Sequence, residues 1–175
     1  MKVQDSIAMV TGGASGLGEA CVRMLVSKGG KATILDLQED RAEKLISELG
    51  SNVVFAKTDV TNEESVQNAV KKTIDAFGGI NVVINCAGVG DPAKLLSKKG
   101  PMPLSFFNRV VQINLVGTFN VIRLAVEQMV KNAPGKDGEK GVVINTASAA
   151  AFDGQVGQPA YSASKAGVVG MTLPL

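Results

Sequence analysis

Short apolar segments alternate with helical segments along most of the chain, and this alternation limits the folds that it can adopt. The apolar segments lack the polar alternation of half-exposed strands, which is typical of strands buried on both faces of a parallel sheet. Helical periodicity fills the gaps between them, at 19–28, at 39–49 and from Thr61 to about Phe77. We expect strands at Ile7–Thr11, Ala32–Leu35, Val53–Ala56, Ile80–Asn85 and Val142–Thr146. The order predicts an α/β fold with a doubly wound, Rossmann-like parallel sheet of five strands.

Size and composition favour one folded domain over residues 1–175. Hydrophobic residues make up 45% of the 175 and charged residues 19%, which is typical of a globular protein. The net charge of +2 is scattered along the chain, so we expect no nucleic-acid partner. No uninterrupted apolar run reaches the length of a membrane span, and the N-terminus has no signal-peptide pattern. We therefore expect no membrane partner and a cytoplasmic location, with the mitochondrial matrix as the alternative.

The chain contains no histidine, which limits the chemistry that it can perform. Histidine is the commonest general base and the partner of nucleophilic serine and cysteine, so those pairs are excluded. We expect no metal site. Cys21 and Cys86 have no C-x-x-C spacing and are interpreted as small buried thiols rather than a disulfide or metal pair. Acid–base chemistry must then come from tyrosine, lysine, carboxylates or cysteine.

A glycine-rich turn follows the first expected strand and opens the first helix. Glycines there let the backbone approach a pyrophosphate, which would meet the unpaired N–H groups of the helix N-terminus. The alternative is a tight turn without a ligand. The candidate binding residues in this turn are Gly12, Ser15, Gly16, Leu17 and Gly18.

Polar residues end the next strands at the same carboxyl edge, where open α/β sheets bind their ligands. Asp36 ends the second strand, where an acidic residue accepts hydrogen bonds from the adenosine ribose and repels a 2′-phosphate. This predicts NAD rather than NADP, although Asp36 could instead be a helix N-cap. The other candidates at this edge are Asp59, Val60, Asn85, Cys86, Ala87 and Gly88.

The only tyrosine of the chain, Tyr161, precedes Lys165 by four residues. If both lie on a helix they share one face, and a cation there favours the phenolate form that can accept a proton. Ser148 leaves the end of the fifth expected strand and could bind a substrate oxygen. We therefore predict an acid–base site for a carbinol or carbonyl. The alternative for Tyr161 is an ordinary half-buried aromatic side chain.

Two further segments interrupt the alternation. Residues 90–103 hold three prolines and three lysines and are expected to form a loop. A long helix is expected from about Leu104 to Lys131, with Asn114 in its middle. A buried amide there needs a partner, so Asn114 is open to either a structural or a functional interpretation.

These motifs resemble those of the short-chain dehydrogenases/reductases. The likeness covers the whole chain and rests on T-G-G-x-x-G-x-G, N-x-A-G, the mid-helix Asn114, Ser148 and Y-x-x-x-K in this order. The segments VTGGASGLG, GTFNVIRL, NTAS and AYSASKAGVVGMTLP are most similar to the type 2 3-hydroxyacyl-CoA dehydrogenases of that family.

The resemblance implies roles for individual residues. Tyr161 would be the general acid/base, Lys165 its cationic partner, Ser148 the residue that orients the substrate oxygen, and Asn114 the holder of a relay water. Tyr161 and Lys165 would also contact the nicotinamide ribose. The implied reaction is the reversible oxidation of a 3-hydroxyacyl-CoA, or a related secondary alcohol, with NAD, in a homo-oligomer that is a tetramer in the family.

Two other functions stay open at this point. One is an NADPH-dependent 3-oxoacyl-carrier-protein reductase, against which Asp36 argues, and the other is a nucleotide-binding scaffold without turnover. The resemblance also implies two more strands, a substrate-covering loop and a Pro-Gly segment beyond residue 175. We therefore expect that the sequence is C-terminally truncated.

Overall fold

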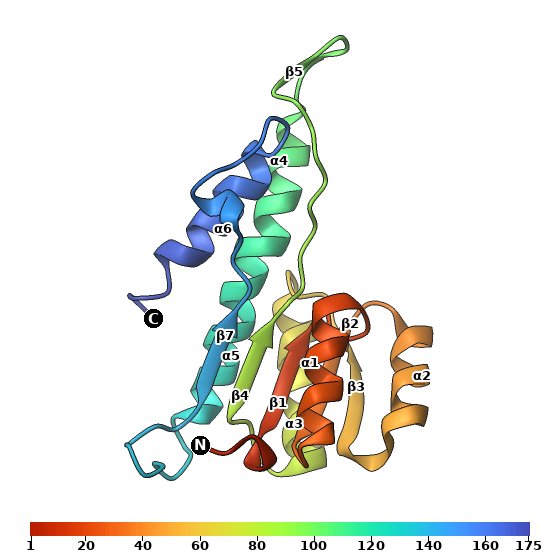
Figure 1. Cartoon of the computed structure of the whole chain (residues 1–175), viewed down its shortest axis with the longest axis vertical. Helices are drawn as coiled ribbons and strands as arrows, with labels where there is room; N and C mark the ends of the chain where they lie inside the picture. Colours follow the sequence, from red (N-terminus) through yellow and green to blue (C-terminus); the bar gives the residue numbers. More distant parts are fainter.

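The protein folds around one five-stranded parallel sheet, as the alternation of segments predicted (Figure 1). The computed structural model describes all residues, 1–175. The strand order is β3-β2-β1-β4-β7, and every neighbouring pair is parallel. The strands are β1 (Ile7–Thr11), β2 (Lys31–Asp36), β3 (Val53–Lys57), β4 (Val82–Asn85) and β7 (Val142–Asn145).

Helices cover both faces of the sheet and bury its apolar side chains in two clusters. The helices α1 (Gly16–Ser27) and α2 (Glu39–Leu49) cover one face, where Val10 and Ile34 are fully buried. The helices α3 (Glu63–Phe77) and α5 (Thr118–Met129) cover the other, over Met9 and Val83. Successive strand residues point to opposite faces, so the continuous apolar segments supply both clusters.

The expected long helix is present but is not a uniform α-helix. It consists of α4 (Leu104–Val111), a π-helical turn (Gln112–Gly117) that contains Asn114, and α5. The stretch Leu104–Met129 is long and apolar enough to cross a membrane by length and composition alone, although polar residues interrupt its apolar ones. Half of the residues in that window are buried inside the protein, and a core helix passes the same test.

The last helix, α6 (Pro159–Gly170), lies beyond the carboxyl ends of the strands rather than on the sheet (Figure 1). It packs against α4, the π-helical turn and the short 3-10 turn at Ala149–Ala151. The loop at 90–103 contains an unexpected hairpin of β5 (Leu96–Ser97) and β6 (Gly100–Pro101), which projects from the end of the molecule.

The start of α3 differs from the prediction. The helix was expected from Thr61, but its N-cap is Asn62, whose Oδ1 accepts from the Ser65 N–H at 2.8 Å. The Thr61 hydroxyl instead donates to Asp59 Oδ1 at 2.7 Å. The hydroxyl of Thr61 thus belongs to the turn after β3, and the helix begins only at Glu63.

Candidate active site

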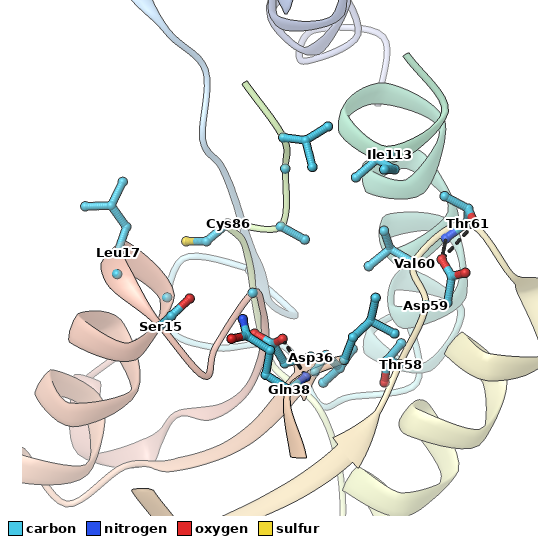
Figure 2. A pocket seen from close by; sticks show the side chains of 18 of the residues that line it. Ser15, Leu17, Asp36, Gln38, Thr58, Asp59, Val60, Thr61, Cys86 and Ile113 are labelled. Carbon is cyan, nitrogen blue, oxygen red and sulfur yellow. Dashed lines mark hydrogen bonds between the residues drawn. The ribbon is translucent and has the colours of Figure 1, made fainter. Parts of the chain in front are cut away.

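A cavity with a volume of about 760 Å³ opens at the carboxyl ends of β1, β2, β3 and β4. Figure 2 shows the side chains that surround it, with Ser15 and Leu17 of the α1 end opposite Val60 and Ile113. It collects most of the residues that the sequence predicted for a dinucleotide site: Gly12, Ser15, Gly16, Leu17, Gly18, Asp36, Asp59, Val60, Cys86, Ala87 and Gly88.

The glycine-rich turn has the geometry of a phosphate cradle. A Cβ on Gly18 would lie 2.2 Å from the Gly12 carbonyl oxygen, so only glycine allows this approach of helix and turn. Gly16 has a φ of +53° and would meet no atom within 4 Å, so its open side faces free space. Ser15 is the N-cap of α1, yet its side chain makes no capping hydrogen bond. The free N–H groups of this helix end therefore fit the pyrophosphate of a dinucleotide.

Asp36 ends β2 and is held by two backbone groups. Its Oδ2 accepts from the Ala14 N–H at 3.1 Å, and its Oδ1 accepts from the Gln38 N–H at 3.0 Å. Each carboxylate oxygen can accept a second hydrogen bond, so the side chain can still receive ribose hydroxyls. The Ala14 contact also ties the end of β2 to the glycine-rich turn.

The residues after β4 separate into two groups. The N–H groups of Cys86 and Ala87 both donate to Thr11 Oγ1, at 3.1 and 3.0 Å, which fixes this turn against β1. Asn85 does not line the cavity: it is buried, and its Nδ2 donates to Asn145 Oδ1 at 2.9 Å. The structure therefore places Cys86, Ala87 and Gly88 at this cavity and leaves Asn85 out of its lining.

Ser148 and Tyr161 line a second, smaller cavity of about 420 Å³, together with Gly90 of the loop after β4. Ser148 caps the short turn that follows it, because its Oγ accepts from the Ala150 N–H at 3.2 Å. Tyr161 lies in the first turn of α6. Neither Tyr161 nor Lys165 lines the larger cavity.

Lys165 lies one helical turn after Tyr161, and its Nζ is 5.8 Å from the centre of the tyrosine ring. Only 6% of the residue is exposed, and its Nζ donates to the Thr146 carbonyl oxygen at 2.6 Å. Burial lowers the pKa of Lys165 below its ordinary value, while the neighbouring Cys86 thiol acts in the opposite direction. The structure thus places a desolvated ammonium beside the phenol, as the four-residue spacing predicted.

Asn114 connects the two cavities. Its Oδ1 accepts from the Val89 N–H at 2.8 Å, and its Nδ2 donates to the Val89 carbonyl at 2.9 Å. The same Nδ2 donates to Ser164 Oγ at 3.1 Å, and Ser164 donates to the Tyr161 carbonyl at 2.7 Å. The fully buried amide therefore ties the loop after β4 to the helix that carries Tyr161.

The thiols are free, and no group of three His, Cys, Asp or Glu side chains could hold a metal ion. Burial raises the pKa of Cys21, and the adjacent Cys86 thiol acts in the same direction. The two cysteines, far apart in the sequence, are therefore neighbours between α1 and the turn after β4.

Comparison with known proteins identifies the family. The family model described as short chain dehydrogenase matches residues 6–175. The chain belongs to the short-chain dehydrogenase family. It is 51% identical to human 3-hydroxyacyl-CoA dehydrogenase type-2 and 49% identical to the Bos taurus protein of that name. Each alignment covers 99% of this chain and 67% of the relative, so about a third of each relative has no counterpart here.

A solved structure supports the same assignment. The crystal structure of 3-hydroxyacyl-CoA dehydrogenase type-2 from Mycobacterium avium matches with a TM-score of 0.91 and 37% identity, over 98% of this chain and 67% of that one. The chain is thus a short-chain dehydrogenase homologue related to the type-2 enzymes, and the family implies a nicotinamide cofactor.

The sequence did not reveal several residues of the site. Thr11 and Thr146 hold the β4 turn and Lys165, and Ser164 bonds Asn114, but each looks like an ordinary strand or helix residue in the sequence. Arg109 of α4 and two residues of the π-helical turn, Gln112 and Ile113, also line the cavity, although they are far in the sequence from the other residues that line it. The unpredicted residues that line the large cavity are Leu35, Leu37, Gln38, Thr58, Thr61, Val89, Arg109, Gln112 and Ile113.

Proposed function

We propose that this protein oxidises the secondary hydroxyl group of 3-hydroxyacyl-CoA thioesters to the 3-oxo compound, with NAD⁺ as the hydride acceptor. The observation that carries the proposal is that Ser148 and Tyr161 line one cavity while the buried Lys165 ammonium lies 5.8 Å from the tyrosine ring. The similarity to proteins named 3-hydroxyacyl-CoA dehydrogenase type-2 supports the substrate class.

Each residue has a distinct task in this proposal. Ser148 Oγ orients the substrate hydroxyl, and the Tyr161 phenolate removes its proton. Lys165 favours the phenolate by its charge. Asn114 bonds Val89 and Ser164 with its amide and so fixes the position of the helix that carries Tyr161. A bound nicotinamide would supply the acceptor for the hydride of the carbinol carbon, so the substrate would lose one proton to Tyr161 and one hydride to the cofactor.

The preference for NAD over NADP rests on Asp36. Only 9% of this residue, at the end of β2, is exposed. A 2′-phosphate beside its carboxylate would bring two negative charges together. The pyrophosphate would bind at the N-terminus of α1, between Gly12, Ser15 and Gly16. Lys165 and Tyr161 would contact the nicotinamide ribose.

A substrate panel tests this function directly. Production of reduced nicotinamide is followed with NAD⁺ or NADP⁺, over 3-hydroxyacyl-CoA thioesters of increasing chain length and simple secondary alcohols. We expect turnover of at least one thioester with NAD⁺, and much slower turnover with NADP⁺. A preference for NADP⁺ would contradict the role of Asp36, and turnover of simple alcohols alone would contradict the substrate class.

A further inference from the structure

Asn120 of α5 reaches across to the loop that follows β3. Its Nδ2 donates to the Val60 carbonyl oxygen at 2.9 Å, and only 7% of the residue is exposed. Its Oδ1 accepts from Nε and Nη2 of Arg123, at 3.2 and 2.9 Å. Arg123 in turn pairs with Glu63 of α3 at 2.8 Å. Both polar atoms of the Asn120 amide therefore have partners: Nδ2 binds the Val60 carbonyl, and Oδ1 binds Arg123.

Gly117 holds the side chain of the same valine. A Cβ at Gly117 would lie 2.6 Å from Val60 Cγ2, so the helix backbone contacts the valine methyl group directly. One short segment of the helix therefore holds Val60 twice, at its carbonyl through Asn120 and at its side chain through Gly117. Asn120 itself does not line the dinucleotide cavity, so its contact with Val60 acts on the cavity from behind.

Val60 lies on the wall of the cavity, with Asp59 and Thr61 beside it (Figure 2). In folds of this type the pyrophosphate meets the first helix N-terminus, and the acidic residue after β2 binds the adenosine ribose. The adenosine half of a dinucleotide therefore lies on the β2 and β3 side, against the wall that contains Val60.

We propose that Asn120 is a positioning residue for the adenosine half of the dinucleotide. Its hydrogen bond to the Val60 carbonyl keeps Val60 in place in the cavity wall. Asn120 thereby raises the affinity for the adenosine half without contacting the ligand itself. The inference rests on the proposed function only in taking the ligand to be a nicotinamide dinucleotide.

The substitution Asn120→Asp separates this role from packing. It preserves the shape of the side chain but replaces the N–H donor with a carboxylate oxygen that faces the Val60 carbonyl. The two oxygens repel each other, so the loop must move away from the helix. Asn68→Asp is the matched control, because Asn68 is an exposed residue of α3.

The experiment measures dissociation constants of the wild-type chain and both variants for three probes: NADH, ADP-ribose and nicotinamide mononucleotide. We expect Asn120→Asp to weaken NADH and ADP-ribose by the same factor, about tenfold for one lost hydrogen bond in a buried place. The mononucleotide should bind as it does to the wild type, and Asn68→Asp should change nothing. Equal weakening of all three probes would show a general structural effect and overturn the proposal.

A second variant keeps the test decisive if Asn120→Asp does not fold. Arg123 has 37% of its side chain exposed, so Arg123→Ala removes the partner of Asn120 Oδ1 without opening the core. It should weaken ADP-ribose by a smaller factor and leave the mononucleotide unchanged. Unchanged ADP-ribose affinity in both folded variants, or in Arg123→Ala alone if the other does not fold, would contradict the inference. A wild-type chain that binds ADP-ribose but oxidises no hydroxyacyl thioester would contradict only the proposed function.

Discussion

At the scale of single residues, Lys165 combines a functional position with a cost in stability. Its side chain is buried, and the hydrogen bond that its ammonium makes is to the neutral Thr146 carbonyl. Burial lowers its pKa from the ordinary value of 10.5. Between the folded and the unfolded pKa the unfolded state binds more protons, so stability increases with pH across that window.

Replacing Lys165 by methionine tests this cost. The methionine fills a similar volume without a charge, so Lys165→Met should have a higher free energy of unfolding than the wild type at neutral pH. The difference should shrink as the pH rises toward about 10, because the buried lysine of the folded state loses its proton at a lower pH than the unfolded one. Urea denaturation at the two pH values measures this. A less stable Lys165→Met at neutral pH would mean that the Thr146 bond outweighs the burial of the charge.

The sequence was informative about single residues where the signal is local. The Tyr161–Lys165 spacing and the glycines of the first turn predicted geometry within one helical turn, and the structure has it. Asn120 and Ser164 were not found, because their partners are Val60 and Asn114, 60 and 50 residues away. A polar residue in a helix has no local mark that tells which distant backbone group it binds.

At the scale of elements, the joint between β1 and α1 depends on two glycines for different reasons. Gly18 has no space for a side chain, because a Cβ would lie 2.2 Å from a backbone oxygen. Gly16 has space but a positive φ of +53°. A side chain at Gly18 would therefore force the helix away from the turn, whereas one at Gly16 would only strain its own residue.

The pair Gly18→Ala and Gly16→Ala separates these two effects. Gly16→Ala should cost about 1–2 kcal/mol, which is the ordinary penalty of a left-handed backbone for alanine. Gly18→Ala should cost more, at or above the roughly 1–3 kcal/mol of overpacking, because a backbone atom blocks the site. Urea denaturation without ligand gives both values. Equal losses would show that the turn can shift to admit a side chain at Gly18.

The elements themselves followed from periodicity, but the details within them did not. All five strands lie where the apolar segments predicted, within one or two residues at each end. The π-helical turn at Asn114 was not predictable, because its apolar spacing continues that of α4 and α5. Thr118 Oγ1 donates to the Asn114 carbonyl at 2.8 Å, which satisfies an oxygen within the irregular turn.

At the scale of the whole molecule, β7 forms an edge of the sheet and has apolar side chains exposed to solvent. Val142 is 38% exposed and Ile144 is 49% exposed, on a strand whose outer edge has no neighbour. Their register partners on β4, Val82 and Ile84, belong to the buried cluster under α1. The sheet face under α1 and α2 therefore continues onto β7 as an apolar surface that no helix covers.

Replacing these two residues by threonine tests whether the surface is open in solution. The variant Val142→Thr with Ile144→Thr should bind less of a dye for apolar surfaces, with its free energy of unfolding changed by less than about 1 kcal/mol. The same change at Val82 and Ile84 is the control, and burial of each hydroxyl there should cost about 1–3 kcal/mol. Unchanged dye binding in the Val142 and Ile144 variant would mean that the surface is covered.

The fold as a whole was the most predictable level, since parallel strands and crossover helices admit few arrangements. The placement of α6 was less predictable. It depends on contacts with α4 and the π-helical turn, where the Leu115 side chain lies against Gly167 too closely for a Cβ. These contacts set where Tyr161 and Lys165 lie, and nothing in the periodicity of α6 indicates them.

The central claim is that Tyr161 removes the substrate proton during oxidation with NAD⁺. The most direct measurement compares wild type and Tyr161→Phe for the rate of NADH formation from a 3-hydroxyacyl-CoA, together with the dissociation constant for NADH. The account predicts that the variant oxidises the thioester about 10²–10⁴-fold more slowly, while its NADH affinity falls only by the small amount that the lost ribose contact of the phenol contributes. A variant that oxidises the thioester at the wild-type rate would contradict it.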